Sequence, residues 1–284
     1  MAKVAVVILN FKVKEETLKC IASVKRSTFK DLEIIVVDNH SSDGLASAIS
    51  SDKKVVFIQN SDNLGYTGGN NVGIKKALED EADFIFILNP DTTVEPKAVK
   101  NLVAELSTEG VGIVGPKILF SDRKTIWYAG GHLDLANVLG GHRGVDEKDS
   151  GQYDQIEETE NVTGGAMMVK REVFEKIGLF DDRYFLYYED SDFCFRARKA
   201  GFRLMYVPTA VVYHDNARST GLGSPLQDYF ITRNRMLFAS KFLPFRTRLA
   251  LIREALKNFK IPARRRALID FLTDNFGRGG FINA

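Results

Sequence analysis

Short runs of apolar residues alternate with amphipathic segments through the first 106 residues of the chain. The apolar runs are rich in β-branched and aromatic residues and are bounded by polar turn formers, which is typical of buried strands. They cover residues 4–9, 33–37, 55–59 and 84–88. The segments with helical spacing cover residues 15–26, 45–50, 70–78 and 96–106. Strands that alternate with helices predict an α/β fold, with a mostly parallel sheet and helices on both faces.

The pattern loosens from residue 110 to residue 151, where glycines and charged residues interrupt the apolar positions. We expect a short strand at residues 111–115, followed by a flexible loop or a hairpin insertion. Regular structure then resumes near Asn161. The expected strands cover residues 163–169, 202–207 and 210–213, and the expected helices cover residues 170–177 and 190–200.

The last section of the chain has a helical pattern. Ser224 provides a side-chain oxygen for an N-cap, Pro225 suits the first helical position, and Gln227 stands at the third. This helix should run to about Lys241, and two more are expected at residues 245–259 and 263–276. We therefore expect residues 1–240 to form the α/β domain and residues 241–284 to form a basic helical extension.

Composition narrows the class of protein. The chain has 284 residues, 44% of them hydrophobic, and can bury the core of one large α/β domain. The run at residues 4–9 is too short for a signal peptide core or a membrane span. Cys20 and Cys194 lie in apolar segments, so we interpret them as structural and expect a reducing cytoplasm. The net charge is only +2, but Lys and Arg crowd the C-terminal end.

Asp91 is the first candidate for chemistry. It follows the buried run at residues 84–88, which stops at Asn89 and Pro90. Ligands of open α/β sheets bind beyond the carboxyl ends of the strands, so a carboxylate at this place suits a ligand site. The alternative is an ordinary turn, since Asn, Pro, Asp and Thr all favour turns.

Two further polar segments follow predicted strands. Asp38 stands at the tip of the second strand, where a carboxylate can accept hydrogen bonds from a nucleobase or ribose. The alternative, favoured for Asp43, is a polar turn that caps the next helix. Residues 63–73 cluster glycines ahead of a helix, so backbone could approach a ligand there, or the segment is a plain turn. Its spacing matches neither a P-loop nor a dinucleotide-binding motif.

Three later groups of residues could also act in catalysis or binding. Glu189, Asp190 and Asp192 precede an apolar helix, where a carboxylate can act as general base or can simply favour the helix N-terminus. His214 follows a strand and is a metal ligand or an ordinary hydrogen-bonding residue. Arg233 and Arg235 could hold a diphosphate or lie on a solvated helix face.

Taken together and in this order, these segments resemble an inverting glycosyltransferase of family 2 with the GT-A fold, in particular its rhamnosyltransferase branch. The resemblance covers roughly residues 4–241. It rests on spaced motifs whose joint occurrence makes coincidence improbable. The motifs are V-V-D-N-H-S-S-D-G, N-L-G-Y-T-G-G-N-N, L-N-P-D-T, T-G-G-A-M-M-V-K-R-E-V-F, G-L-F-D-D-R-Y-F-L-Y-Y-E-D-S-D-F-C-F-R and Y-F-I-T-R-N-R.

The resemblance implies a role for each candidate residue. It implies that Asp190 is the catalytic base and that residues 1–107 form the nucleotide-binding half, with the acceptor side in residues 108–240. Asp91 would bind Mg²⁺ or Mn²⁺ under the donor diphosphate, with His214 as a further ligand. The other implied donor contacts are Asn10, Asp38, Gly68, Gly69, Asn70, Asn89, Arg233 and Arg235, and the implied acceptor-side residues are Gly164, Gly165 and Glu189.

One residue departs from the pattern of the family. Asn89 occupies the first acidic position of the metal motif, and an amide oxygen is a poorer ligand than a carboxylate. If a metal binds, it would therefore rest on Asp91, His214, phosphates and waters.

The resemblance implies transfer of a sugar, with L-rhamnose from dTDP-rhamnose as the best expectation and a UDP-sugar as another donor. The acceptor would be a glycan or a lipid-linked glycan in cell-surface polysaccharide synthesis, and no nucleic acid is expected. The basic C-terminal helices could lie on the anionic inner face of the cell membrane or pack on the catalytic domain. Two other functions remain open here: a sugar nucleotidyltransferase, or a non-catalytic protein that binds sugar nucleotides or nucleic acid.

Overall fold

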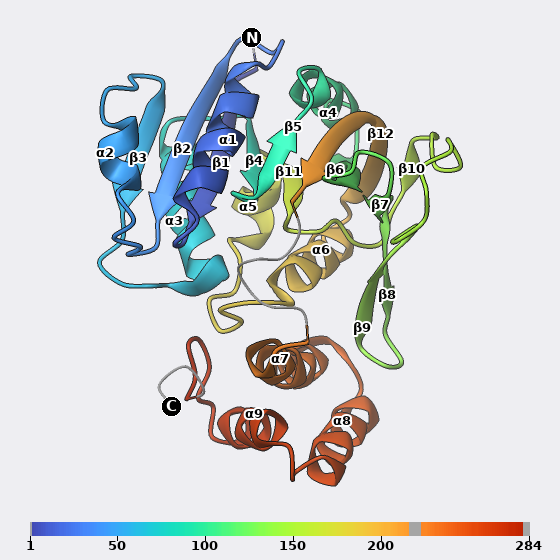
Figure 1. Ribbon diagram of the computed structural model, residues 1–284. Helices are drawn as coiled ribbons and strands as arrows, with labels where there is room; N and C mark the ends of the chain where they lie inside the picture. Colours follow the sequence, from blue (N-terminus) through green and yellow to red (C-terminus); the bar gives the residue numbers. More distant parts are fainter. Residues whose placement is uncertain (1, 216–222, 281–284) are drawn as a thin grey trace.

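A ten-stranded mixed sheet forms the centre of the protein in the computed structural model, which describes residues 2–215 and 223–280 (Figure 1). The strand order along the sheet is β3, β2, β1, β4, β11, β6, β12 and β10, with β5 paired to β12 and β7 paired to β6. Most pairs of the N-terminal half are parallel, whereas β11 runs antiparallel to both of its neighbours. The expected α/β class, with a mostly parallel sheet and a C-terminal helical part, is confirmed.

The N-terminal half alternates strands and helices as the sequence pattern predicts, except for a short strand at residues 92–94 that was not predicted. Its strands are β1 (Val4–Asn10), β2 (Leu32–Asp38), β3 (Val55–Gln59), β4 (Phe84–Leu88) and β5 (Thr92–Val94). Its helices are α1 (Lys14–Lys25), α2 (Leu45–Ile49), α3 (Gly65–Glu79) and α4 (Ala98–Leu106). The register places Asn10 opposite Asp38 and Ile8 opposite Leu88, so the polar residues that follow these strands share one edge of the sheet.

The second half completes the sheet and adds a hairpin. Its strands are β6 (Val111–Phe120), β7 (Ile126–Tyr128), β8 (Gly131–Asp134), β9 (Leu139–His142), β10 (Glu157–Glu158), β11 (Ala166–Lys170) and β12 (Arg203–His214). Its helices are α5 (Arg171–Ile177) and α6 (Glu189–Lys199). The expected hairpin insertion is the pair β8 and β9. β12 is one strand instead of the two expected, because the chain passes the interruption at Pro208 through a register shift between Val207 and Val211.

The sheet buries one apolar cluster on each face. Alternate residues of β1 separate the two clusters: Val4, Val6 and Ile8 face α1 and α4, while Ala5 and Val7 face α3, α5 and α6. This is why the strands read as continuous apolar runs in the sequence. Cys20 lies in the first cluster and Cys194 in the second, both buried and free, as expected of structural cysteines.

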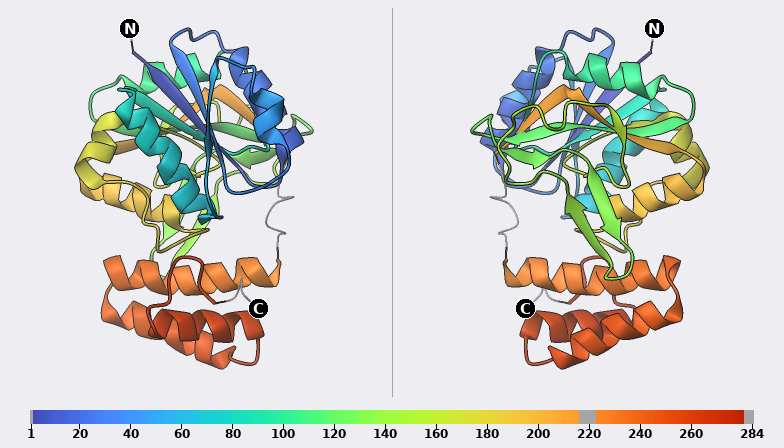
Figure 2. Two further views of the ribbon diagram at one scale, coloured as in Figure 1. Left: turned by 90° about the vertical axis from the view of Figure 1, so that its left-hand side faces the viewer. Right: turned by 90° about the vertical axis from the view of Figure 1, so that its right-hand side faces the viewer.

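Three C-terminal helices pack on one another beside the sheet, on the side at which β2 ends (Figures 1 and 2). They are α7 (Pro225–Phe242), α8 (Phe245–Lys257) and α9 (Pro262–Leu272), and we call them the helical layer. Ser224 caps α7, because its side chain accepts a hydrogen bond from the amide of Gln227 across 3.2 Å. The expected boundary at residue 240 falls inside α7, so the helical layer begins at Pro225. Within the described residues, the chain has no helix that is long and apolar enough to cross a membrane.

Candidate active site

Asp91 and His214 meet at the carboxyl end of the sheet. The Nε2 atom of His214 lies 3.1 Å from Oδ1 of Asp91, and the side chains are 6% and 13% exposed. Strand pairing causes this contact, since β12 runs antiparallel to β5 and places His214 opposite Thr92. The backbone supports the same approach, because the amide of Asp215 donates to the carbonyl oxygen of Asp91 across 2.9 Å. The carboxylate of Asp91 and the imidazole of His214 are thus held together beyond the end of β4, where the sequence predicted a ligand site from Asp91.

Gly164 and Gly165 connect this end of the site to Asp190. The amide of Asn89 donates to the carbonyl of Gly165 across 3.0 Å. The amide of Gly164 donates to Oδ2 of Asp190, also across 3.0 Å. Asp190 receives a second backbone hydrogen bond at Oδ1, from the amide of Ser191 across 2.7 Å. The turn ahead of β11 therefore stands between Asn89 and the carboxylate of Asp190.

Tyr66 fixes the other side of that turn. Its hydroxyl donates to the carbonyl of Gly164 across 2.5 Å, and a Cβ atom at Gly164 would lie only 2.8 Å from the hydroxyl oxygen. Burial and the neighbouring carboxyl groups of Glu189, Asp190 and Asp91 raise the pKa of Tyr66 well above its usual value. Tyr66 thus holds the same glycine whose amide donates to Asp190.

Glu189 and Asp190 are neighbouring carboxyl groups in different surroundings. Glu189 is only 5% exposed, and its Oε2 atom has no hydrogen-bond partner among the described residues. Burial and the charge of Asp190 raise the pKa of Glu189 well above its usual value, which favours the protonated form of Glu189. Two adjacent carboxyl groups whose surroundings differ in this way are suited to different roles.

Asn10 and Asp38 form a buried polar cluster at the ends of β1 and β2. The Nδ2 atom of Asn10 donates to Oδ1 of Asp38 across 2.6 Å, while Oδ2 of Asp38 accepts hydrogen bonds from the Ser41 amide and the Gln59 side chain. Burial would raise the pKa of Asp38, but the hydrogen bonds from Ser41, Asn10 and Gln59 outweigh it and lower the pKa below its usual value. Asp43 belongs to the polar turn before α2, where its Oδ1 accepts from the Leu45 amide across 3.1 Å, but the N-cap residue is Gly44 and no side chain caps the helix.

The sequence model for "Glycosyl transferase family 2" matches residues 5–178, more than half of the chain. The chain belongs to glycosyl transferase family 2. Hexosyltransferase Agl10 of low-salt glycan biosynthesis, from Haloferax volcanii, is 28% identical over 82% of this chain and 74% of its own length. N-acetylglucosaminyl-diphospho-decaprenol L-rhamnosyltransferase of Mycobacterium tuberculosis is 28% identical over 71% of this chain and 72% of its own.

Solved structures show the same fold. GalNAc-T7 with UDP, GalNAc and Mn²⁺ aligns with a TM-score of 0.64 at 19% identity, over 83% of this chain and 51% of the longer enzyme. The mannosyltransferase PcManGT of Pyrobaculum calidifontis, in complex with GDP-Man and Mn²⁺, aligns with a TM-score of 0.59 at 18% identity, over 99% of this chain and 76% of its own. These structures confirm the expected GT-A fold, and the family model with the two relatives confirms the glycosyltransferase class.

The glycine-rich segment of this glycosyltransferase has a different local structure from the expected turn. α3 begins at Gly65, so Gly68 and Gly69 lie within the helix and not ahead of it. A Cβ atom at Gly69 would lie 2.4 Å from Leu9, and one at Gly73 would lie 2.4 Å from Val7. These glycines let α3 pack closely on β1, which accounts for them without a ligand. Asn70 is buried, and its Oδ1 atom has no hydrogen-bond partner among the described residues.

The two arginines of α7 do not lie free to bind a diphosphate. Arg233 is 0% exposed, and all five N–H groups of its guanidinium donate to protein acceptors. Arg235 pairs with Glu254 across 2.9 Å and donates to the carbonyl of Asn137. These contacts give no support to the expected diphosphate contact at either arginine. Sequence spacing could not show which way these side chains point.

Sequence reasoning missed several residues around the site. The ring of Trp127 stands edge-on to His142 and His214, with centroid distances of 4.4 and 4.6 Å. Burial lowers the pKa of His142, and its Nδ1 atom lies 3.2 Å from the carbonyl oxygen of Trp127. Lys19 and Arg123 line a hollow beside Asp91, together with the acids Glu16 and Asp215. Trp127 is the only tryptophan of the chain, which is the one sequence signal that could have singled it out.

Asp91 and His214 are the residues that could hold a divalent cation. No group of three or more His, Cys, Asp or Glu residues suited to a metal occurs in the described part of the chain. A cation of the Mg²⁺ type, however, usually takes one or two protein carboxylates and completes its shell with substrate phosphates and water. Asp91 and His214 therefore fit as the protein ligands of a metal site whose remaining ligands would come from a bound diphosphate and water. Position 89 is Asn and supplies no second carboxylate.

Proposed function

We propose that this chain is an inverting glycosyltransferase that moves L-rhamnose from dTDP-rhamnose to a glycan or lipid-linked glycan during cell-surface polysaccharide synthesis. The anchored carboxylate of Asp190 is the observation that carries the catalytic part of the proposal. The choice of sugar is supported by relatives such as the dTDP-rhamnosyl transferase RfbF of Shigella flexneri, which is 26% identical over 73% of this chain and 71% of its own length.

The proposed reaction is a single displacement. Asp190 accepts the proton of an acceptor hydroxyl while the oxygen attacks the anomeric carbon of the donor. A new glycosidic bond forms, the bond from the anomeric carbon to the diphosphate oxygen breaks, and the nucleoside diphosphate leaves from the opposite face. Gly164 and Ser191 hold the carboxylate through backbone amides, so its direction depends on the fold and not on a flexible side-chain partner.

We assign the donor to the edge that begins at Asn10 and Asp38 and ends at Asp91. Asp38 would accept a hydrogen bond from the nucleobase of the donor. Asn70 and Asn89 would line the pocket of the sugar nucleotide. The residues that would face the acceptor are Gly164, Gly165 and Glu189. Bound Mg²⁺ or Mn²⁺, held by Asp91 and His214, would offset the charge that grows on the leaving diphosphate. Lys19 and Arg123 are the described cations that line the hollow beside Asp91, so they replace Arg233 as candidates for diphosphate contacts.

We further propose that the helical layer rests on an anionic membrane surface, as a lipid-linked acceptor would require. Phe245, Leu256 and Leu272 of α8 and α9 are 66%, 53% and 60% exposed. Five basic residues share these elements and the turn between them, and none forms an ion pair with another described residue: Arg246, Arg253, Lys257, Lys260 and Arg265. The inward face of α8 is formed by Leu251 and Ala255, which lie in the core of the helical layer.

Both proposals can be tested with purified full-length protein. Release of nucleoside diphosphate from dTDP-rhamnose should exceed release from UDP-sugars when a lipid-linked glycan acceptor is present. Turnover of a UDP-sugar alone would overturn the choice of donor, and no turnover of any donor would overturn the enzymatic role. In flotation assays, vesicles with anionic lipid should carry the protein upward more than neutral vesicles do. Equal flotation with Lys257→Glu/Lys260→Glu and wild type would overturn membrane docking.

A further inference from the structure

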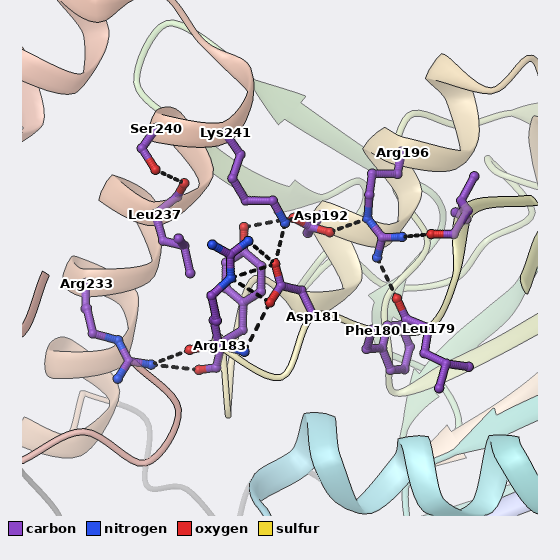
Figure 3. A network of polar contacts seen from close by, with 12 residues as sticks. Leu179, Phe180, Asp181, Arg183, Asp192, Arg196, Arg233, Leu237, Ser240 and Lys241 are labelled. Atoms are coloured by element: carbon purple, nitrogen blue, oxygen red, sulfur yellow. Dashed lines mark hydrogen bonds and ion pairs between the residues drawn. The ribbon is translucent and has the colours of Figure 1, made fainter. Parts of the chain in front are cut away.

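The loop that leads into Asp190 is bound by two side chains of α7. We call residues 181–188 the base loop. The Nη2 atom of Arg233 donates to two of its carbonyl oxygens, and Nδ2 of Asn234 donates to three, over distances from 2.8 to 3.1 Å. The acceptors are the carbonyls of Arg183, Tyr184, Leu186 and Tyr187. Both donor side chains are fully buried, and Figure 3 shows Arg233 reaching from α7 to this loop.

The base loop has a backbone conformation that needs support from outside. Phe185, Tyr187 and Tyr188 have φ angles of 64°, 67° and 74°. Bulky residues rarely adopt this left-handed region, because the Cβ atom crowds the backbone. The loop therefore needs contacts with other parts of the protein to keep this strained backbone conformation. Arg233 and Asn234 provide such contacts, because the carbonyls that they bind belong to residues 183–187 of the loop. Asp190 follows Tyr188 by two residues, so a change of path would move the carboxylate.

Lys241 ties the start of the base loop, and the helix α6 that follows the loop, to α7. Its Nζ atom lies 2.6 Å from Oδ2 of Asp181, at the start of the base loop, and also contacts Asp192 in the first turn of α6. Asp192 is completely buried and accepts further hydrogen bonds from Tyr184 across 3.0 Å and from Arg196 across 2.6 Å. Figure 3 shows Lys241 between the two aspartates. The N-terminus of α6 is thus held relative to α7 on both sides of Asp190.

We propose that Arg233, Asn234 and Lys241 are positioning residues for the catalytic base, so that the helical layer is part of the catalytic unit. This inference rests on the proposed role of Asp190 as the base. Asp190 must lie within hydrogen-bond reach of the acceptor hydroxyl, and a misplacement of about 1 Å can cost about a hundredfold in rate. α7 supplies the rigid support that keeps the first turn of α6, with Asp190, at hydrogen-bond distance from the Gly164 amide.

Asn234→Ala is the variant that tests the proposal, because it removes three hydrogen bonds from the base loop. We expect kcat with dTDP-rhamnose and a lipid-linked acceptor to fall about tenfold to a hundredfold, while binding of dTDP stays within about twofold. Leu268→Ala is the matched control: it opens a cavity in the core of the helical layer and contributes no hydrogen bond to the base loop. It should lower thermal stability to a similar extent and leave kcat of the folded protein near that of wild type.

A double-mutant cycle with Asp190→Asn separates positioning from general structural support. If Asn234 acts through Asp190, Asn234→Ala should lower kcat only slightly once Asp190 is already Asn. Independent, multiplying effects would overturn the proposal, as would an Asn234→Ala protein with kcat within twofold of wild type. Hydrogen exchange supplies a readout that needs no substrate, since amides of residues 183–192 should exchange faster in Asn234→Ala and those of β1 should not. If Asp190→Asn transfers sugar at the wild-type rate, the assignment of Asp190 as the base is wrong. If the amides of residues 183–192 exchange no faster in Asn234→Ala than in wild type, the support of the base loop by α7 is refuted instead.

Discussion

The backbone amide of Gly164 donates a hydrogen bond to Oδ2 of Asp190 across 3.0 Å, and this contact joins the two halves of the candidate site. Gly164 lies just ahead of β11, whereas Asp190 lies in the first turn of α6. The same turn holds Asn89 through the carbonyl of Gly165. The carboxylate of Asp190 is therefore fixed in relation to the strand end that carries Asp91.

Asp190→Asn should abolish transfer and retain donor binding. The amide has nearly the shape of the carboxylate but cannot accept the proton of the acceptor hydroxyl, so kcat should fall by about a hundredfold to ten-thousandfold. Calorimetric binding of dTDP should stay within about twofold of wild type. A variant that transfers sugar at nearly the wild-type rate would show that another group is the base.

Gly164→Ala should impair catalysis through Tyr66. The new methyl group would lie 2.8 Å from the tyrosine hydroxyl, so the turn or the ring must move. We expect a loss of about 1–3 kcal/mol in the free energy of unfolding and a lower kcat. Adding Tyr66→Phe removes the atom in closest contact and should restore part of the lost stability, as chemical denaturation can show. No recovery in the double variant would place the clash elsewhere.

Asp91→Ala should remove metal-dependent nucleotide binding. In wild type we expect Mn²⁺ to tighten dTDP binding, because a cation held by Asp91 and His214 would contact the diphosphate. The variant should bind dTDP equally with and without Mn²⁺ in calorimetric titrations. Wild-type binding that does not depend on the metal would contradict the assignment.

Glu189→Gln should stabilise the protein more at neutral pH than at acidic pH. Burial raises the pKa of Glu189 in the folded state above its unfolded value, so the folded state holds this proton more tightly. The ionised residue therefore costs stability as pH rises above the unfolded pKa near 4.5, and the cost disappears below it. The neutral amide avoids that cost, so the difference in Tm between variant and wild type should grow from pH 4 to pH 8. A difference that shrinks with rising pH would contradict a buried, protonated Glu189.

Gly69→Ala should destabilise the fold without a direct effect on the nucleotide site. A Cβ atom there would lie 2.4 Å from Leu9, and overpacking of this kind costs about 1–3 kcal/mol. Gly140→Ala on β9 is the matched control, because its new methyl group would have no neighbour closer than 3.7 Å. If Gly69→Ala keeps full stability but loses dTDP binding, then this glycine serves the ligand and not the packing of α3.

Much of the fold was predictable from local pattern. The strands at Val55–Gln59 and Phe84–Leu88 match their predicted bounds, because the polar turn formers on either side of each apolar run mark where the strand begins and ends. Ser224 was also identified correctly as a helix cap, because capping depends only on residues within three positions of each other. The start of α3 was missed because Gly68 and Gly69 disfavour a helix locally. The close packing of Gly69 on Leu9 of β1 favours the helix there and could not be read from local sequence.

The sequence by itself determined the main strands and helices of the first 106 residues, the family and the acids that follow the strands, because these depend on neighbours along the chain. Only the tertiary structure decided which of those residues meet. It paired His214 with Asp91 through the β5 and β12 ladder, and it joined Gly164 to Asp190. It also turned Arg233 inward to the base loop, against the role that sequence similarity implied. Spacing along a chain fixes the position of a residue, but strand pairing and burial decide which groups its side chain contacts.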